Sequence, residues 1–128
     1  MNWDVPMLIA CIAVGGAIGA VLRAVLRYVA AQYLFTSEFP WGTFLVNMVG
    51  CTLLTFVAFS LSGNMSKNME LFLFTGVFGG FTTMSTFTLE TVNLFYENEM
   101  LKAAWNVILN GGGCLLGAFA GRFLALLV

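Results

Sequence analysis

Charged residues are scarce in this chain, and histidine is absent. Five basic and six acidic residues make up 9% of its 128 residues, whereas a soluble domain has about 25%. Because 60% of the residues are hydrophobic, these few charges cannot solvate an ordinary protein surface. A net charge of −1 without a basic cluster also argues against nucleic-acid binding. The composition therefore predicts an integral membrane protein.

The sequence also lacks the side-chain combinations that most enzymes need. It shows no nucleophile paired with a base, no catalytic dyad and no phosphate-binding loop, so we predict no enzyme activity. Its cysteines, Cys11, Cys51 and Cys114, are odd in number and match no metal-binding spacing, and we expect them to pack as small apolar residues. No Lys or Arg precedes the first apolar run, which is atypical of a cleaved signal sequence. We therefore expect that run to remain in the mature protein.

Four apolar segments are each close to the roughly 20 residues that a membrane-spanning helix needs. We place them at about 5–33, 41–61, 69–96 and 100–127. The connections between them are short, and Ser66 or Asn68 could cap the third helix. The sequence thus predicts an all-α membrane protein with a single four-helix transmembrane domain over residues 1–128. Any function must reside in that bundle.

The third segment carries a polar stretch, GGFTTMSTFTLET, at residues 79–91. Two adjacent glycines are followed by six Ser or Thr hydroxyls and by the carboxylate of Glu90. Polar side chains at membrane depth normally face a partner helix or a wet cavity, and paired glycines with β-branched threonines weaken a continuous helix. Broken membrane helices persist only where the freed backbone is buried in protein or lines a passage. We therefore predict a broken third helix with a permeation or binding site around it.

Two further rows of neutral polar residues follow the four-residue spacing of one helix face. Thr43 and Asn47 form the first row, and Asn106 and Asn110, extended by Cys114, form the second. Such residues can simply hydrogen-bond neighbouring helices together. Where they meet a broken helix they also favour a lined pathway. Amide, hydroxyl, phenyl-edge and helix N-terminal N–H groups would suit a dehydrated anion, whereas freed carbonyls would suit a small cation.

The glycine spacing and the charge distribution both bear on assembly. Small residues at four-residue intervals, as at Gly15 and Gly19 or Gly76 and Gly80, let membrane helices approach closely, either within one subunit or between two. Because four thin helices make a poor pore, we expect an oligomer. Basic residues are shared almost evenly between the two sides of the predicted bundle, Lys67 and Arg122 against Arg23, Arg27 and Lys102. Since an excess of Lys and Arg normally sets orientation, we predict insertion both ways and antiparallel pairing.

The segments WGTFLVN at residues 41–47 and GG-x-TT-x-STF-x-x-ET at residues 79–91 resemble the bacterial fluoride channel family known as Fluc or CrcB. The resemblance extends over the whole chain, including the glycine-rich first helix with Arg23 near its end. It implies an antiparallel, dual-topology homodimer in the bacterial inner membrane, whose two pores pass fluoride passively and keep cytoplasmic fluoride low. It also implies a structural sodium ion (Na+) at the dimer centre, held by the backbone carbonyls of Gly79 and Thr82 from both subunits.

The resemblance also implies roles for individual residues. Asn47 matches the pore asparagine of the family and Phe87 the second phenylalanine of its phenyl box, whereas Met84 stands where the family usually has its first pore phenylalanine. A thioether is polarizable but has no electropositive ring edge, so we expect an altered fluoride site there. The implied pore and fluoride-binding residues are Asn47, Met84, Ser85, Phe87, Asn106 and Asn110, the implied polar track is Thr43, Thr86, Glu90 and Thr91, and Arg23 is the pore-mouth candidate.

Two other functions compete with a fluoride channel. A small dual-topology exporter of cationic compounds would use Glu90 as its proton-coupling acid, so its transport would need protons and respond to organic cations. A membrane scaffold or assembly subunit would move no ion, and substitutions at Asn47 or Phe87 would then affect only packing.

Overall fold

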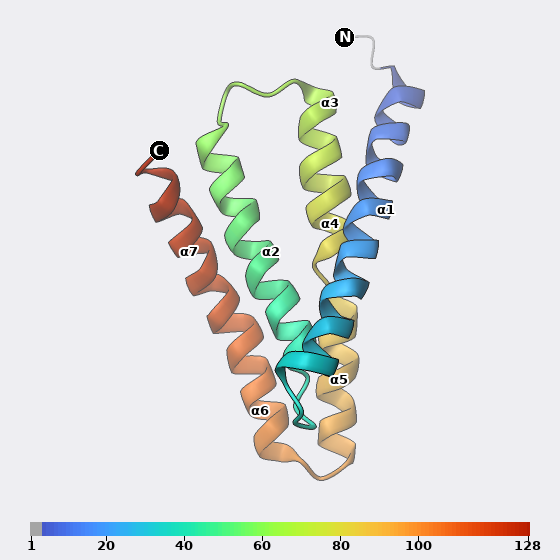
Figure 1. Ribbon diagram of the computed structural model, residues 1–128, viewed down its shortest axis with the longest axis vertical. Helices are drawn as coiled ribbons and strands as arrows, with labels where there is room; N and C mark the ends of the chain where they lie inside the picture. The colour runs from blue at the N-terminus through green and yellow to red at the C-terminus, as the bar shows by residue number, and fades with distance from the viewer. Residues whose placement is uncertain (1–3) are drawn as a thin grey trace.

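The computed structural model describes residues 4–128 as four long helical segments joined by short connections (Figure 1). The first segment comprises α1 (Val5–Val29) and the wider, π-helical turns of η1 (Ala30–Leu34), and the second is α2 (Trp41–Ser60). The third comprises α3 (Lys67–Glu70), the π-helical η2 (Leu71–Phe78), α4 (Gly79–Phe81) and α5 (Met84–Tyr96). The fourth comprises α6 (Met100–Ile108), the π-helical η3 (Leu109–Gly113) and α7 (Cys114–Ala125).

Each segment is long and apolar enough to cross a membrane, over Val5–Leu34, Trp41–Ser60, Lys67–Tyr96 and Met100–Ala125. Residues 4–128 contain helices and no strand, so the predicted all-helical class with four membrane-length helices is confirmed. The start of α1, the α2–α3 connection and the C-terminus lie at one end of the molecule, and the other two connections lie at the opposite end (Figure 1). Short connections between neighbouring segments produce this up-and-down arrangement.

The third segment begins where the sequence provides a cap. The Oγ of Ser66 accepts a hydrogen bond from the backbone N–H of Met69 at 3.3 Å, which satisfies one of the donors that a helix start leaves unpaired. Gly63, with φ at +79°, makes the preceding turn in a conformation that favours glycine. Of the two expected caps, Ser66 is therefore the one that the structure uses.

Glycines let the first and third segments pack closely. A Cβ atom at Gly80 would lie 2.6 Å from the carbonyl oxygen of Gly16, and one at Gly15 would clash with the carbonyl oxygen of Phe72. The same holds between α2 and α7, where a Cβ at Gly121 would clash with the carbonyl oxygen of Thr52. These small-residue rows therefore make helix contacts within one chain, as such rows allow in membranes.

Helical structure stops in the middle of the third segment. Thr82 (φ −78°, ψ 156°) and Thr83 (φ −146°, ψ 113°) have extended backbones between α4 and α5. The helix restarts with Thr83 as its cap, because the Thr83 Oγ1 accepts a hydrogen bond from the Thr86 N–H at 3.2 Å. This path takes the N–H of Thr83 out of the helical hydrogen-bond ladder, whereas its C=O stands at the cap position, where a carbonyl accepts the first bond of the helix. The Thr83 N–H therefore needs another partner, since buried backbone polar groups are rarely left unpaired.

Buried polar side chains gather around this interruption rather than at the ends of the bundle. The buried polar residues of the described chain are Thr43, Asn47, Thr83, Asn106 and Asn110. Inside a membrane such groups must find their partners within the protein. The contacts among them define the candidate site.

Candidate functional site

Asn47, on α2, hydrogen-bonds both backbone groups of Thr83 and supplies the partner that the Thr83 N–H needs. The Oδ1 of Asn47 accepts a hydrogen bond from the Thr83 N–H at 2.8 Å, and its Nδ2 donates to the Thr83 carbonyl at 3.1 Å. A neutral amide fits this position because it has both a donor and an acceptor. Asn47 therefore holds the extended backbone between α4 and α5 against α2.

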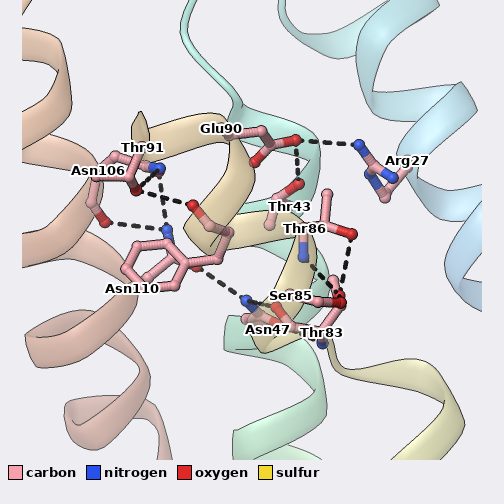
Figure 2. A network of polar contacts seen from close by, with 11 residues as sticks. Arg27, Thr43, Asn47, Thr83, Ser85, Thr86, Glu90, Thr91, Asn106 and Asn110 are labelled. Atoms are coloured by element: carbon pink, nitrogen blue, oxygen red, sulfur yellow. Dashed lines mark hydrogen bonds and ion pairs between the residues drawn. The ribbon is translucent and has the colours of Figure 1, made fainter. Parts of the chain in front are cut away.

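A series of side-chain amides continues from Asn47 along the fourth segment (Figure 2). The Nδ2 of Asn47 also donates to Asn110 Oδ1 at 2.9 Å, and Asn110 Nδ2 donates to Asn106 Oδ1 at 3.0 Å. Asn106, which is 0% exposed, then donates to Thr91 Oγ1 at 2.9 Å. Asn110 lies in η3, whose wider turns are of a kind often found at functional sites. The two rows expected from the sequence thus meet in one directed series of hydrogen bonds, the amide series.

A second cluster surrounds the carboxylate of Glu90 (Figure 2). The Oε1 of Glu90 accepts a hydrogen bond from Thr43 Oγ1 at 2.7 Å and forms an ion pair with Arg27 Nη2 at 3.0 Å. The guanidinium offsets the negative charge, which would otherwise be costly at membrane depth. These three side chains line a cavity of about 400 Å³ that also contacts η1 and the start of α2; we call it the mouth cavity.

An inner cavity of about 260 Å³ lies beside the interruption. Its walls come from α2, the extended backbone, α5 and the fourth segment, and the lining residues are Asn47, Cys51, Thr82, Thr83, Met84, Phe87, Asn110, Gly111 and Cys114. Four of the expected pore residues, Asn47, Met84, Phe87 and Asn110, therefore share one space. Asn106 connects to this space through its hydrogen bond with Asn110.

The start of α5 combines internal contacts with an exposed face. Thr83 Oγ1 donates a hydrogen bond to Thr86 Oγ1 at 3.0 Å and lies 3.4 Å from Ser85 Oγ. Ser85 is exposed, and Met84 is 72% exposed. A serine hydroxyl exposed at the middle of a membrane span is costly when lipid covers it. This face therefore needs either water or another protein surface beside it.

The carbonyls expected to hold sodium lie at the interruption. In a continuous helix the Gly79 carbonyl would accept from the Thr83 N–H, which here donates to Asn47 Oδ1. The Thr82 carbonyl would accept from the Thr86 N–H, which here donates to Thr83 Oγ1. Both carbonyls thus lose their helical donors, and carbonyl oxygen is a ligand that small hard cations prefer. The Thr82 carbonyl, however, accepts a hydrogen bond from Arg23 Nη1 here, so a sodium ion would share that ligand with a guanidinium.

Arg23, expected at the pore mouth, contacts the interruption. Its Nη1 donates to the Thr82 carbonyl at 3.4 Å, whereas the basic residue that lines the mouth cavity is Arg27. One cation thus stands beside the extended backbone, and another stands at the mouth cavity one helical turn away on the same helix face.

The sequence-based predictions missed site roles for Arg27 and Thr83. Arg27 entered them only through the charge balance, although a cation inside one span and a single carboxylate inside another are expected to pair. Thr83 was part of the motif but had no role, although a hydroxyl just before a restarting helix is a typical cap. Both signals were therefore present in the residues themselves.

Known proteins resemble the chain over most of its length. The family model described as "CrcB-like protein, Camphor Resistance (CrcB)" matches residues 10–122. A "Fluoride-specific ion channel FluC" from Clostridium perfringens is 40% identical over 121 residues, which cover 93% of this chain and 94% of that protein. Proteins of the same name from Shewanella halifaxensis (39% over 113 residues, 87% of this chain and 90% of that protein) and Methanococcus aeolicus (37% over 119 residues, 91% and 94%) are similar too. These matches show that the chain belongs to the CrcB-like protein family.

Proposed function

We propose that this multi-pass membrane protein is a fluoride channel through which fluoride leaves the cytoplasm passively, lowering its toxicity. The observation that carries the proposal is the Asn47 amide, which bridges the interrupted third segment and begins the amide series. The residues of the site favour a small anion. The relatives support fluoride as that anion, because proteins named fluoride-specific ion channels are 40% identical to this chain across most of its length.

Neutral donors can replace water around fluoride without placing a fixed charge beside it. Each amide of the series donates to a protein acceptor, the oxygens of Asn110, Asn106 and Thr91 in turn. A fluoride ion would substitute for one acceptor at a time, so the donors exchange partners and no buried donor is left unpaired. At the inner cavity, Phe87 contributes an electropositive ring edge and Met84 a polarizable thioether.

Glu90 acts in this proposal as a paired, structural acid. An unpaired carboxylate would repel an anion, but Arg27 and Thr43 bind its Oε1 at 3.0 Å and 2.7 Å. We place the entrance of the path at the mouth cavity, with the polar track of Thr43, Thr86, Glu90 and Thr91 between that cavity and the amide series. Arg23, beside the Thr82 carbonyl, would add positive potential that attracts an anion to the interruption.

We propose further that the working unit is an antiparallel homodimer, inserted in both orientations in the inner membrane. The exposed Met84 and Ser85 at the middle of a span support a covering partner, and so does the nearly even distribution of basic residues. A second copy would complete the wall of each inner cavity, which gives two pores. Its Gly79 and Thr82 carbonyls would join those of the first copy around the structural sodium ion.

Fluoride efflux from liposomes tests the proposed function. Purified protein is reconstituted into vesicles loaded with potassium fluoride, and external fluoride is followed with an ion-selective electrode after addition of a potassium ionophore. We expect fast release of fluoride without a pH gradient, no comparable release of chloride, and no effect of a protonophore. Vesicles that contain folded protein and release fluoride no faster than empty vesicles would contradict the proposal.

The same assay addresses the two alternatives. An exporter driven by protons needs an acid that exchanges its proton freely, whereas Glu90 is held in an ion pair, and the relatives are named as channels. An exporter would show transport that stops without a proton gradient and competes with organic cations. A scaffold would release no ion from any vesicle.

A further inference from the structure

Three sulfur-bearing side chains line the inner cavity, and the two thiols among them have no role in the proposed passage of fluoride. Cys51 on α2 and Cys114 at the start of α7 line this cavity together with Met84 from α5. Both cysteines are free thiols, and both line this one cavity from neighbouring helices. Two thiols and one thioether from three helices therefore share a space of about 260 Å³; we call these three side chains the sulfur group.

The amide series explains why the two thiols meet. Cys51 follows Asn47 by four residues on α2, and Cys114 follows Asn110 by four residues on the fourth segment. Residues four apart lie on the same helix face one turn away. Since Asn47 and Asn110 are hydrogen-bonded at 2.9 Å, the next turn of each helix brings the thiols together. The contact is therefore fixed by the same helix register that builds the proposed pore.

We propose that the sulfur group is a binding site for a soft, monovalent d10 cation of the copper(I) or silver(I) class. Thiolate and thioether sulfur select such ions, whereas oxygen ligands select hard cations. Cys51 and Cys114 supply the two principal ligands. Met84, which is flexible and 72% exposed, supplies a third, weaker donor at the open side of the cavity.

Binding exchanges protons for the metal without any change of oxidation state. Each thiol loses its proton to water, and each sulfur keeps the electron pair with which it binds the cation. One monovalent cation and two thiolates give a complex of net charge −1. A metal with fixed negative charge in the inner cavity opposes the entry of an anion, so we expect it to block fluoride. The block rests on the proposed function, whereas the binding does not.

Counting bound silver tests the binding. Purified protein in chloride-free buffer is titrated with Ag⁺, free ion is removed, and retained metal is measured by mass spectrometry. The wild type and the control Cys11→Ser, whose residue lies outside the cavity lining, should each retain about one tightly held Ag⁺ per chain. Cys51→Ser and Cys114→Ser should each lower the affinity for Ag⁺ at least about tenfold. Even the loss of a residue that only hydrogen-bonds to a metal ligand lowers metal affinity by about this factor. Met84→Leu should lower it less.

Fluoride efflux with and without Ag⁺, compared within each variant, tests the block. Ag⁺ should stop efflux through the wild type and Cys11→Ser but not through Cys51→Ser or Cys114→Ser. Cys51→Ala and Cys114→Ala repeat the test with side chains that need no hydrogen-bond partner.

Each outcome has a distinct meaning. Equal Ag⁺ affinity in all variants would overturn the site and leave the thiol contact as helix packing alone. If silver binds at the two thiols but the wild type still conducts fluoride, then the sulfur group does not lie in the fluoride path. Absence of fluoride efflux before Ag⁺ is added would count against the proposed function, while the metal count would still decide the binding.

Discussion

Asn47 makes three hydrogen bonds to buried partners, two with the backbone of Thr83 and one with Asn110. A leucine of similar volume would keep the packing but remove all three. A valine at Thr83 would keep the hydrogen bonds of the Thr83 backbone to Asn47 but would remove the cap on the Thr86 N–H. Asn47 therefore connects the interruption to both α2 and the fourth segment.

Asn47→Leu should lower the free energy of unfolding by about 2–6 kcal/mol, because the Thr83 N–H and the Asn110 Oδ1 each lose a partner at about 1–3 kcal/mol. Denaturant unfolding in detergent, followed by tryptophan fluorescence, measures the change. Asn93→Leu is the matched control, since Asn93 is exposed on α5, and it should change stability little. Equal losses in the two variants would show that the bridge to Thr83 does not stabilise the interruption.

Phe87→Ile should abolish fluoride efflux or reduce it at least about tenfold, which corresponds to about 1.4 kcal/mol in the barrier. Isoleucine keeps an apolar side chain in the inner cavity but removes the ring edge. The dimer should stay intact, and gel filtration checks this. Unchanged efflux through a well-folded Phe87→Ile protein would remove Phe87 from the pathway.

At the scale of helices, close packing by glycine sets how the first and third segments meet. A Cβ at Gly19 would clash with the carbonyl oxygen of Val77 and lie 2.9 Å from the backbone N of Phe81, one residue before the interruption. A Cβ at Gly16, in the same helix, would meet no other side chain or segment within 4 Å in residues 4–128. The two neighbouring positions therefore differ sharply in the room that they offer.

Gly19→Ala should lower the free energy of unfolding by about 1–3 kcal/mol, because the backbone at Val77 in η2 and Phe81 in α4 has to shift to admit a methyl group. Gly16→Ala should be neutral, or should stabilise the helix by up to about 1 kcal/mol, since alanine is the better helix former. Thermal unfolding of both variants in detergent makes the comparison. Similar destabilisation by both would mean that α1 does not pack on the third segment through Gly19.

The four membrane-spanning helices could be predicted from the sequence. Apolar segments of this length, joined by short connections, leave few other structures for a chain in a membrane. The wider turns of η1, η2 and η3 were not predicted, because the apolar periodicity does not distinguish them from α-helix. Within the site, spacing predicted that Asn106 and Asn110 share a face. It could not predict that Asn110 would meet Asn47, because that contact depends on the relative register of two helices. Contacts that depend on spacing within one helix could therefore be predicted, whereas contacts that depend on the register between helices could not.

For the whole molecule, the polar site is incomplete on one side. The start of α5 exposes Met84 and Ser85, and Met84 also lines the inner cavity. The glycine rows, which could have served a dimer, are used within the chain. An antiparallel partner would therefore have to contact the third segment at the interruption, where the two inner cavities would face each other.

Dual insertion predicts that a tag on the N-terminus reaches both membrane faces, with roughly half of the copies on each, since the basic residues give almost no orientation bias. Protease protection of the tag in intact and inverted vesicles measures this fraction. Adding three lysines to the α2–α3 connection should shift nearly all copies to one orientation and reduce efflux, because antiparallel pairs could no longer form. A tag found on one face only in the unmodified protein would contradict antiparallel pairing.

Electrical recording in a planar bilayer under a fluoride gradient tests the central claim most directly. Passive passage of fluoride along neutral donors predicts a current that reverses at the equilibrium potential of fluoride, with the same reversal potential when a pH gradient is imposed. A reversal potential that follows the proton gradient, or bilayers with folded protein that carry no fluoride current, would contradict the account.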